Sequence, residues 1–323
     1  MMRVLVTGAG GMVGSHMVEV LYARDHDVVG TYYKPTVEIS EISRDIKLIE
    51  CDVRYYKKVL DVIEKYRPDW IFHLAAQSFP TVSWERPQET MDVNVNGTIA
   101  IFEAVKHIRK WFSPSYDPMV VVACSSAEYG ESLNKLEGDD IFIGEDTALL
   151  PLHPYGVSKV AQDLLSFQYY MNDNIRCIRA RIFNSTGTRK IHDVTSDFTK
   201  RAVESEMDGS YRIYVGNMNT RRAIMDQRDL INALLLLAGN GGAGEVYNIS
   251  SEKIYSGRDI IRYIEAAVGH DYKTIVDERL LRPTDERVIA GDVSKLKRDT
   301  GWVQEIPMEK TVSDMIAYWR MKI

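Results

Sequence analysis

Short apolar runs rich in β-branched residues alternate with stretches of helical apolar spacing over roughly the first 180 residues. The runs are typical of strands buried on both faces, and they are Arg3–Thr7, Asp27–Tyr32, Ile46–Cys51, Trp70–Leu74, Met119–Cys124 and Arg176–Ile182. The clearest helical stretches between them are Tyr55–Tyr66, Gln88–Trp111 and Tyr155–Asn172. This alternation predicts right-handed strand–helix–strand units, and therefore an α/β fold built on a doubly wound parallel sheet.

The alternation loosens after about Phe183, where shorter helical and strand-like pieces follow. We predict a larger domain over residues 1–183, to which residues of about 220–250 return, and a smaller, discontinuous α/β lobe over most of residues 184–323. Gly130–Pro154 is polar and irregular, and we expect it to cover the site. Ligands of such sheets bind beyond the carboxyl ends of the strands, so the loops that follow the strands are the places to look for chemistry.

Three glycines, Gly8, Gly11 and Gly14, lie between the first strand and the first helical stretch. Gly8 permits a tight turn, Gly11 lets the backbone approach a pyrophosphate, and Gly14 lets the helix pack against the strand. The N–H groups at the start of the helix, around Met12 and Val13, favour a bound diphosphate. The strand before the glycines and the helix after them favour a dinucleotide-binding Rossmann turn over an ordinary turn.

Composition restricts the class of partner. The chain has 323 residues, 45% of them hydrophobic and 27% charged, which is typical of a soluble globular protein. The net charge of -6 argues against a nucleic-acid surface. Cys51, Cys124 and Cys177 show no paired spacing, which indicates reduced thiols and a cytoplasmic protein. The apolar runs are too short for a membrane span, and the histidines form no ligand pattern with the cysteines, so we expect neither a membrane partner nor a metal.

The loops after strands two and three bear on the choice of cofactor. An acidic residue after strand two would bind a ribose diol and favour NAD, but the run here passes from Tyr32 to Lys34 without one. Lys34 can meet a 2′-phosphate, which favours NADP over NAD, although it can equally be a solvated loop charge. After strand three, Asp52 and Val53 stand where a carboxylate either accepts from the adenine amino group or caps the next helix.

The fourth strand ends in His73, followed by small or short residues that let a cofactor lie flat against the backbone; these are Leu74, Ala75, Ala76 and Gln77. His73 itself fits a hydrogen-bonded core histidine better than a catalyst.

The fifth strand and the helix that follows it carry the candidate chemistry. Tyr155 and Lys159 are four residues apart, so they share one helical face. A phenol with an unperturbed pKa of about 10 is too weak a base at neutral pH, but a nearby ammonium and an oxidised nicotinamide favour its phenolate. Ser125, at the end of the fifth strand, can hydrogen-bond the same substrate oxygen. A Tyr-x-x-x-Lys pair alone is usually a surface feature, but the dinucleotide turn and the serine occur in the expected order.

With these residues in view, nearly the whole chain resembles the extended short-chain dehydrogenase/reductases that act on nucleotide sugars. It is most similar to the GDP-mannose 4,6-dehydratase group and its relative, GDP-4-keto-6-deoxymannose reductase, with a GDP-N-acetylglucosamine 4,6-dehydratase as a close variant. The similar segments are His73–Ser78 with Val82–Trp84, Asn94–Thr98, Tyr155–Lys159, Arg181–Asn184, Asp193–Phe198, Arg282–Asp285 and Gly301–Trp302.

The resemblance implies that Tyr155 removes the proton of the sugar 4-hydroxyl while a hydride passes from C4 to the nicotinamide. Lys159 holds the nicotinamide ribose, and Ser125 binds the C4 oxygen. It adds Asn94, Cys124 and Phe183 to the residues expected around the cofactor. The residues expected to contact the GDP-sugar are Ser78, Ser83, Ser125, Ser126, Asn184, Asp193, Val194, Arg222, Arg282 and Asp285.

The chain departs from the dehydratase pattern after strand five. Dehydratases of this group eliminate the 6-hydroxyl with a glutamate whose place here is Ala127, and Glu128 stands one residue later. On an extended strand end, one step turns a side chain to the opposite face, so Glu128 replaces that acid only if the loop turns; Ser126 is a further candidate. We expect a 4,6-dehydratase, with a 4-keto reductase or 4-epimerase as the alternative and a non-enzymatic NADP-binding protein as a lesser one.

Members of this family usually pair as dimers, or dimers of dimers, through the helices predicted here over Gln88–Trp111 and Tyr155–Asn172. On the first of these, Ile99, Phe102, Val105 and Ile108 form an apolar stripe, although such a stripe is more often core than interface. The homodimer is therefore implied by the resemblance rather than by the stripe.

Overall fold

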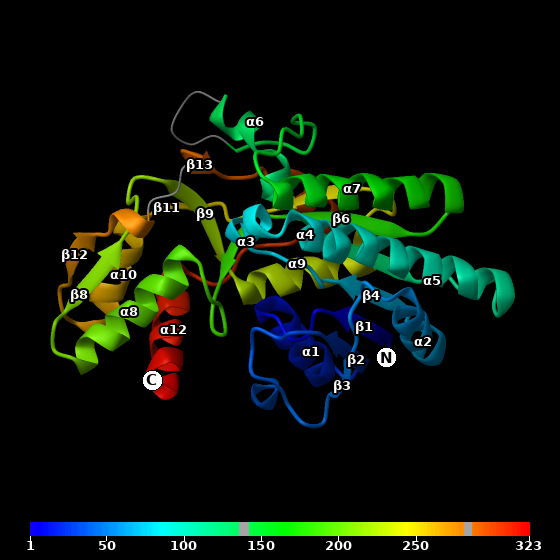
Figure 1. Ribbon diagram of the computed structural model, residues 1–323, viewed down its shortest axis with the longest axis horizontal. Coiled ribbons are helices and arrows are strands. Elements are labelled where there is room, and N and C mark those ends of the chain that lie inside the picture. Colours follow the sequence, from blue (N-terminus) through cyan, green and yellow to red (C-terminus); the bar gives the residue numbers. More distant parts are fainter. Residues whose placement is uncertain (136–141, 281–285) are drawn as a thin grey trace.

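A parallel sheet forms the centre of the computed structural model, which describes residues 1–135, 142–280 and 286–323. In this part of the chain the sheet has 7 strands in the order β10-β6-β5-β4-β1-β2-β3 (Figure 1). The strands are β1 (Arg3–Thr7), β2 (Asp27–Tyr32), β3 (Lys47–Glu50), β4 (Trp70–His73), β5 (Met119–Ser125), β6 (Cys177–Ile182) and β10 (Val246–Ile249). The predicted doubly wound parallel sheet is confirmed, because neighbouring strands pair in parallel register throughout.

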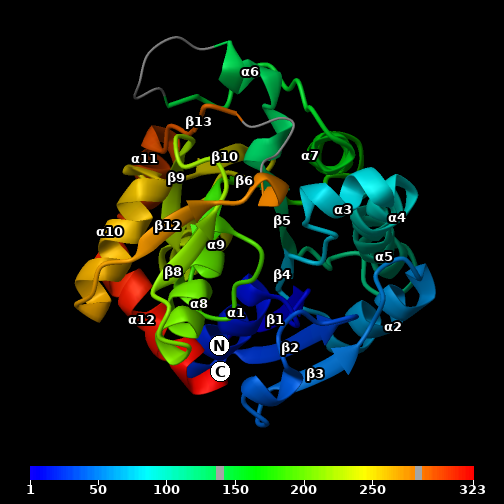
Figure 2. The ribbon, with the colours of Figure 1, turned by 60° about the vertical axis from the view of Figure 1, so that its left-hand side comes forward.

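Helices cover both faces of this sheet, which explains the continuous apolar runs of its strands. On one face lie α1 (Met12–Ala23), α9 (Gln227–Asn240) and α11 (Ser294–Thr300), and on the other lie α2 (Tyr56–Tyr66), α5 (Gly97–Trp111) and α7 (Pro154–Asp173). Figure 2 shows the second group along one side of the strands. Each face has its own core, with Leu21 and Leu234 in the first and Ile63 and Phe102 in the second.

The helix predicted over Gln88–Trp111 is three pieces rather than one. A short helix α4 (Pro87–Met91) leads through a π-helical turn at Asp92–Asn96 into α5. Asn94 lies within that turn and uses its side-chain amide outside the helix, on the backbone of Gln77. Apolar spacing does not reveal such a turn, because one extra residue per turn changes the helical phase only locally.

The C-terminal half contributes both to the central sheet and to a second body of structure. β10 extends the sheet beside β6, and α9 packs beneath it. The remaining helices α8 (Val194–Met207), α10 (Gly257–Val268) and α12 (Met308–Lys322) share a separate apolar core (Figure 1, left). The short strands there are β7 (Asn184–Thr186), β8 (Arg212–Val215), β9 (Arg221–Asp226), β11 (Ile254–Ser256), β12 (Lys273–Val276) and β13 (Val288–Ile289). The domain boundary at about residue 183 stays a prediction.

Two further segments lie above the strand ends. The loop after β4 forms α3 (Pro80–Glu85), and the segment after β5 forms α6 (Glu131–Asn134). Residues 142–150 then return over the sheet: Ile143 pairs with Gly291, and Leu150 pairs with Gly130. Within the described ranges, every helix is too short or too polar to cross a lipid bilayer.

Candidate active site

The glycine turn after β1 has the shape that its sequence predicts. Gly8 has φ +76°, and a Cβ atom on it would lie 2.7 Å from the Ala75 backbone nitrogen. A Cβ atom on Gly14 would lie 2.2 Å from the Gly8 carbonyl oxygen, so the helix and the strand meet at backbone distance. Helix α1 begins after Gly11 without a side-chain cap, so side chains do not occupy its first N–H groups. This cradle fits a pyrophosphate, and Met12 and Val13 supply its first N–H groups.

The fourth strand end is fixed by a chain of buried hydrogen bonds. His73 Nδ1 lies 2.9 Å from Thr7 Oγ1, and His73 Nε2 lies 3.1 Å from Thr98 Oγ1. Burial lowers the pKa of His73 to about 3, so its imidazole is neutral at physiological pH. Thr7 Oγ1 also accepts a hydrogen bond from the Ala75 N–H at 3.2 Å. His73 is therefore a core residue, as interpreted from the sequence, and it places the small residues of the loop.

Asn94 braces the same loop. Its amide exchanges hydrogen bonds with the Gln77 backbone, at 2.8 Å to the N–H and 3.1 Å to the carbonyl, and it donates to Ser158 Oγ at 2.8 Å. These contacts tie the loop after β4 to α7. Leu74, Ala75, Ala76 and Gln77 are half-buried, whereas Ser78 is exposed.

The loops after β2 and β3 are held by charges of their own. Lys34 has a side chain that is 66% exposed, and its Nζ lies 3.8 Å from a Glu89 carboxylate oxygen. Asp52 is buried and accepts hydrogen bonds from the Arg54 guanidinium at 2.6 and 3.0 Å, which keep the pKa of its carboxyl low despite burial. The Arg54 guanidinium also lies 5.7 Å from the centre of the Tyr33 ring, beside Lys34 in sequence. Sequence reasoning passed over Arg54; its position two residues after Asp52 was the available signal.

The structure brings Ser125, Tyr155 and Lys159 together at the end of β5. Lys159 Nζ donates to the Ala123 carbonyl at 2.7 Å and lies 5.7 Å from the centre of the Tyr155 ring. Ser125 hydrogen-bonds Tyr155. All three residues are at most 9% exposed. A proton acceptor, a hydroxyl donor and an ammonium therefore converge on one small region beside the loop after β4.

Burial dominates the electrostatics of these groups. It raises the pKa of Tyr155 to about 12, with the Ser125 hydrogen bond acting in the opposite direction. It lowers the pKa of Lys159 to about 8, while the neighbouring Cys124 and Glu128 raise it. A phenol with so high a pKa needs positive charge beside it before it can serve as a base. Lys159 is the ammonium on this helix that supplies such charge.

The position of Glu128 differs from that of a base facing a substrate. Ser126–Glu128 form a single 3₁₀ turn, which carries the Glu128 side chain back beneath Ser125. Its Oε1 accepts a hydrogen bond from the Ser125 N–H at 2.8 Å, and the residue is 0% exposed. Its Oε2 lies 3.2 Å from Arg181 Nε. The loop does turn, as the elimination role required, but it turns the carboxylate inward rather than outward.

Glu128 belongs to a buried cluster of charges. Asp163 accepts from Arg179 Nη1 at 2.7 Å and from Arg181 Nε at 2.9 Å. Candidate ligand atoms of Cys124, Glu128 and Asp163 lie within 4.8 Å of one another, a spacing that would suit a metal ion. The Arg181 guanidinium supplies the positive charge there instead. Sequence reasoning gave Asp163 and Arg181 no role, although a charged residue in a doubly buried strand signals a buried ion pair.

The remaining residues expected around the cofactor are buried or half-buried in the protein. Val53 lies against the start of α5, where a Cβ atom on Gly97 would be 2.8 Å from its side chain. Cys124 and Phe183 are each 3% exposed, and Tyr32 is half-buried at the end of β2. Their contacts with a cofactor stay predictions.

The residues expected around the sugar nucleotide come from several elements of the chain. Asn184 opens β7, and its side-chain oxygen is buried without a hydrogen-bond partner among the described residues, as expected of a group that a ligand contacts. Arg222 lies on β9 and donates to the Glu286 carbonyl at 2.7 Å. Arg282 and Asp285 lie outside the described residues.

Two other members of this set, Ser83 and Asp193, already have partners within the protein. The Ser83 hydroxyl donates to the Pro80 carbonyl at 2.6 Å inside α3, and Ser83 is 0% exposed. Asp193 caps α8 through the Ser196 N–H at 2.7 Å, and Val194 is the first residue of that helix. Ser126 is half-buried beside Ser125. Substrate contacts by these residues stay predictions.

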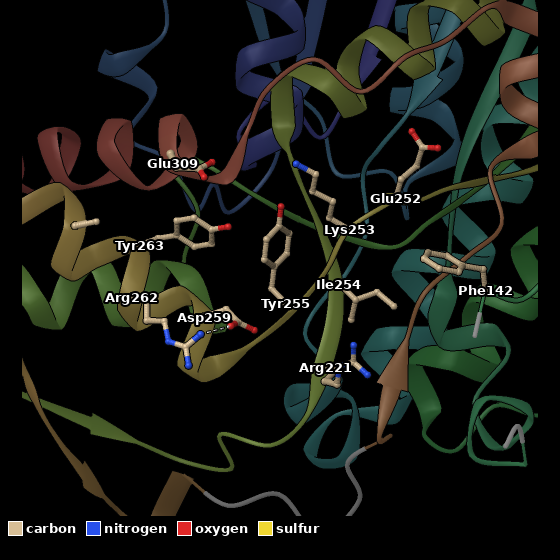
Figure 3. A pocket seen from close by; sticks show the side chains of 11 residues that line it. Phe142, Arg221, Glu252, Lys253, Ile254, Tyr255, Asp259, Arg262, Tyr263 and Glu309 are labelled. Carbon is tan, nitrogen blue, oxygen red and sulfur yellow. Dashed lines mark hydrogen bonds and ion pairs between the residues drawn. The ribbon is translucent and has the colours of Figure 1, made fainter. Parts of the chain in front are cut away.

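A cavity of about 800 Å³ lies elsewhere, between β11 and α10 (Figure 3). Its lining includes Arg221, Tyr255 and Tyr263. It also includes Asp259 and Arg262, which form an ion pair on α10. Arg221 and Arg222 alternate on β9, so the cavity meets the first arginine and lies on the other side of the strand from the second. The strand-end groups Ser125, Tyr155 and Lys159 do not line it, so we place the chemistry at the strand ends rather than in this cavity.

Comparison with known proteins adds a family and relatives to this geometry. The family described as GDP-mannose 4,6 dehydratase matches residues 5–315. GDP-6-deoxy-D-mannose reductase of Pseudomonas aeruginosa is 25% identical, covering 99% of this chain and 98% of its own. GDP-mannose 4,6-dehydratase of Yersinia enterocolitica is 25% identical, covering 98% of this chain and 93% of its own.

Two solved structures resemble the fold. UDP-glucose 4-epimerase of Thermotoga maritima, solved with UDP-glucose, has a TM-score of 0.88 at 21% identity and covers 99% of each chain. MoeE5, solved with UDP-glucuronic acid and NAD, has a TM-score of 0.82 at 25% identity and covers 99% of this chain and 100% of its own.

Proposed function

Because the chain belongs to the GDP-mannose 4,6-dehydratase family, whose members are extended short-chain dehydrogenase/reductases acting on nucleotide sugars, we propose that it performs a hydride transfer at C4 of a GDP-linked hexose. The observation that carries this proposal is the convergence of Ser125, Tyr155 and Lys159 at the end of β5. The glycine turn, the uncapped start of α1 and the small residues after β4 fit a nicotinamide dinucleotide beside them. When bound, that cofactor supplies the hydride acceptor or donor for C4.

The residues of this chain divide the remaining work. Tyr155 exchanges the proton of the C4 oxygen, and Ser125 hydrogen-bonds the same oxygen and orients it. Lys159 holds positive charge beside the phenol and lowers the cost of the phenolate. Its Nζ is already anchored on the Ala123 carbonyl, so its distance from Tyr155 is fixed by β5 and α7 rather than by a mobile side chain.

Within this class we propose a 4-keto reductase or a 4-epimerase as the activity that the geometry favours. Elimination of the 6-hydroxyl needs a base near C5, and in the turn at residues 125–129 Ala127 has no acid while the Glu128 carboxylate is buried beneath Ser125. Reduction or epimerisation at C4 needs only a hydride from or to the cofactor and a proton that Tyr155 exchanges while Ser125 orients the C4 oxygen. The relative named GDP-6-deoxy-D-mannose reductase, which matches over 99% of this chain, agrees with this choice.

A GDP-hexose 4,6-dehydratase, acting on GDP-mannose or GDP-N-acetylglucosamine, remains the second candidate. It is favoured by the family match over residues 5–315 and by the relatives named GDP-mannose 4,6-dehydratase. It requires an acid from a residue other than Glu128.

For the cofactor we propose NADP, with NAD as the alternative, because Lys34 stands at the end of β2 where a 2′-phosphate would lie. Guanine as the base of the substrate follows from the names of the relatives alone.

We also propose a homodimer, or a dimer of such dimers, formed through α5 and α7. The stripe of Phe102, Val105 and Ile108 on α5 is core, because each of these residues is 0% exposed. An outward stripe lies on α7 instead: Leu164 is 55% exposed and Met171 is 61% exposed, seven residues apart and thus on one helical face.

The proposed function is tested by incubating the purified protein with three substrates under two conditions. GDP-mannose and GDP-N-acetylglucosamine are supplied without reductant, and GDP-4-keto-6-deoxymannose is supplied with NADPH or NADH. A reductase should consume the 4-keto sugar together with the reduced cofactor, and a 4-epimerase should invert C4 of a hexose without added reductant and without loss of water. Loss of water from either hexose would instead establish the dehydratase. Cofactor binding with no turnover of any nucleotide sugar would overturn the enzymatic proposal.

A further inference from the structure

We propose that Glu128 is a positioning residue, held as a neutral carboxylic acid, which fixes the Ser125 backbone from beneath and takes no proton from the substrate. This inference rests on the proposed role of Ser125. It assigns a function to a buried carboxylate that the family chemistry does not use at this position of the turn.

The hydrogen bonds around the turn are reciprocal. The Ser125 hydroxyl accepts from the Ala127 N–H at 3.2 Å, while Glu128 Oε1 accepts from the Ser125 N–H at 2.8 Å. The two bonds close a capping box on a 3₁₀ turn only three residues long. Ser125 ends β5 opposite Ile182 of β6, and the Glu128 carboxyl takes the Ser125 N–H, so it helps to fix where the strand ends and where the Ser125 hydroxyl lies.

The partners of the cluster leave no positive group for Glu128 alone. Asp163 receives the Arg179 Nη1 and the Arg181 Nε through hydrogen bonds of 2.7 and 2.9 Å. Arg181 Nη1 donates to Tyr129 OH and to the Glu145 carbonyl. Glu128 Oε2 is fully buried, forms no hydrogen bond among the described residues, and lies 3.2 Å from the Arg181 Nε that donates to Asp163. The two carboxyl groups thus share one guanidinium N–H, and a buried carboxylate whose only positive partner is shared is costly unless it is protonated.

The titratable and charged groups that face Glu128 come from three elements. Asp163 and Lys159 face it from α7, Arg181 from β6 and the Cys124 thiol from β5. Burial and the nearby Asp163 carboxylate raise the pKa of Glu128 to about 8, against the effects of Arg181 and Lys159. Two carboxylates this close in a dry site do not both ionise readily. Asp163 has two guanidinium partners and Glu128 shares one of them, so Glu128 is the carboxyl that we assign the proton.

The same cluster reaches the segment over residues 142–150. Arg181 bonds the Glu145 carbonyl at 2.9 Å, and Glu145 Oε1 accepts from the Asn248 N–H at 2.8 Å. Tyr129 OH donates to Asn248 Oδ1 at 2.6 Å. The turn at residues 125–129 is therefore braced by β6, β10 and residues 142–150 together. Its Ser125 hydroxyl hydrogen-bonds Tyr155, while its Glu128 carboxyl serves as the brace.

Two substitutions at Glu128 separate the length of its side chain from the need for an ionisable group. Glu128→Gln keeps an acceptor oxygen at the same distance and is isosteric with the neutral acid, so we expect kcat to stay within about threefold of the parent. Glu128→Asp keeps the acid but shortens it by one methylene, so we expect kcat to fall by about 10- to 100-fold with KM little changed. Glu131→Gln is the matched control and should change neither constant, because the half-buried Glu131 on the nearby α6 uses its carboxyl only on the exposed Asn134 amide among the described residues.

A readout independent of turnover separates this inference from the proposed function. Amide hydrogen exchange of the Ser125 N–H, followed in the full-length chain, should stay slow in Glu128→Gln and become fast in Glu128→Asp. If Glu128→Gln loses activity and protection as severely as Glu128→Asp, the neutral positioning role is overturned. If the parent chain turns over no nucleotide sugar yet the exchange pattern holds, the brace stands and only the proposed function fails.

Discussion

The two ends of the proposed cofactor site are built in opposite ways. At the nicotinamide end, Tyr155 and Lys159 are buried, and the groups around them have fixed partners in β5, β6 and α7. At the adenosine end, Lys34 has a side chain that is 66% exposed, and it shares an ion pair of 3.8 Å with Glu89. Both ends lie at the carboxyl edge of one sheet, but Lys159 is buried whereas the Lys34 side chain faces water.

The difference is one of dielectric environment. A buried hydrogen bond or charge pair that is broken costs the full desolvation of its partner, whereas an exposed pair contributes about 0–1 kcal/mol because water and salt screen it. We therefore expect substitutions among the buried groups around Tyr155 to have large effects. We expect substitutions at the exposed Lys34 to change the preference between NAD and NADP only slightly. The following experiments test that contrast, from the largest expected effect to the smallest.

Removing the phenol should give the largest effect. We expect Tyr155→Phe to reduce kcat by about 10²–10⁴-fold, the usual contribution of a general acid–base group, while cofactor affinity and thermal stability stay near those of the parent. The control is Tyr169→Phe on the same helix, where the hydroxyl donates to Glu103 rather than facing the strand ends. Equal activity of the two variants would remove Tyr155 from the chemistry.

Breaking the buried ion cluster should destabilise the fold itself. We expect Arg181→Met to lower the free energy of unfolding by about 3–5 kcal/mol, because Asp163 then loses one of its two guanidinium partners. The control is Arg176→Met just before the same strand, where an exposed pair with Asp117 should contribute no more than about 1 kcal/mol. Urea unfolding of the three proteins measures the difference, and similar losses would contradict the contrast between buried and exposed charge.

His73 should make the free energy of unfolding fall in mildly acidic solution. Its pKa is about 3 in the fold against 6.5 for an unperturbed histidine, so the folded state binds fewer protons. Stability from this group is present above pH 6.5 and is lost as the pH falls toward 3. Between pH 7 and 5.5 we expect a loss of about 1 kcal/mol that His73→Gln lacks. Parallel unfolding curves for both proteins at the two pH values would show that His73 is not held neutral.

The exposed end should give the smallest effect. We expect Lys34→Ala to weaken NADPH binding by about 2- to 5-fold and to leave NADH binding unchanged, because only the 2′-phosphate meets that charge. Added salt should shrink the difference. Lys57→Ala, on the exposed face of α2 beside Asp61, controls for net charge. A loss of affinity for both cofactors alike would show that Lys34 does not read the 2′-phosphate.

The local patterns of the chain predicted the parts of the site whose geometry depends on near neighbours. Gly8, Gly11 and Gly14 form the expected turn, and the four-residue spacing of Tyr155 and Lys159 puts both on one side of α7. The sheet, its parallel strands and their connecting helices also follow from apolar spacing, because period 2 and period 3.6 are properties of the chain itself. The π-helical turn that interrupts the predicted helix at Asn94 was missed, because Asn94 bonds Gln77, 17 residues away, and apolar spacing carries no sign of such a contact.

The sequence by itself determined that this chain folds as a doubly wound parallel sheet with a glycine turn, a serine, a tyrosine and a lysine in the order of a nucleotide-sugar enzyme. The direction of the Glu128 carboxyl was decided by tertiary structure, because Arg181 and Asp163 come from elements far along the chain. The Arg181 guanidinium lies against the Glu128 carboxyl on the buried side, whereas the residue order alone left both directions open. The physical reason is that a charge in a dry interior must find its partners in space, and periodicity carries no record of them.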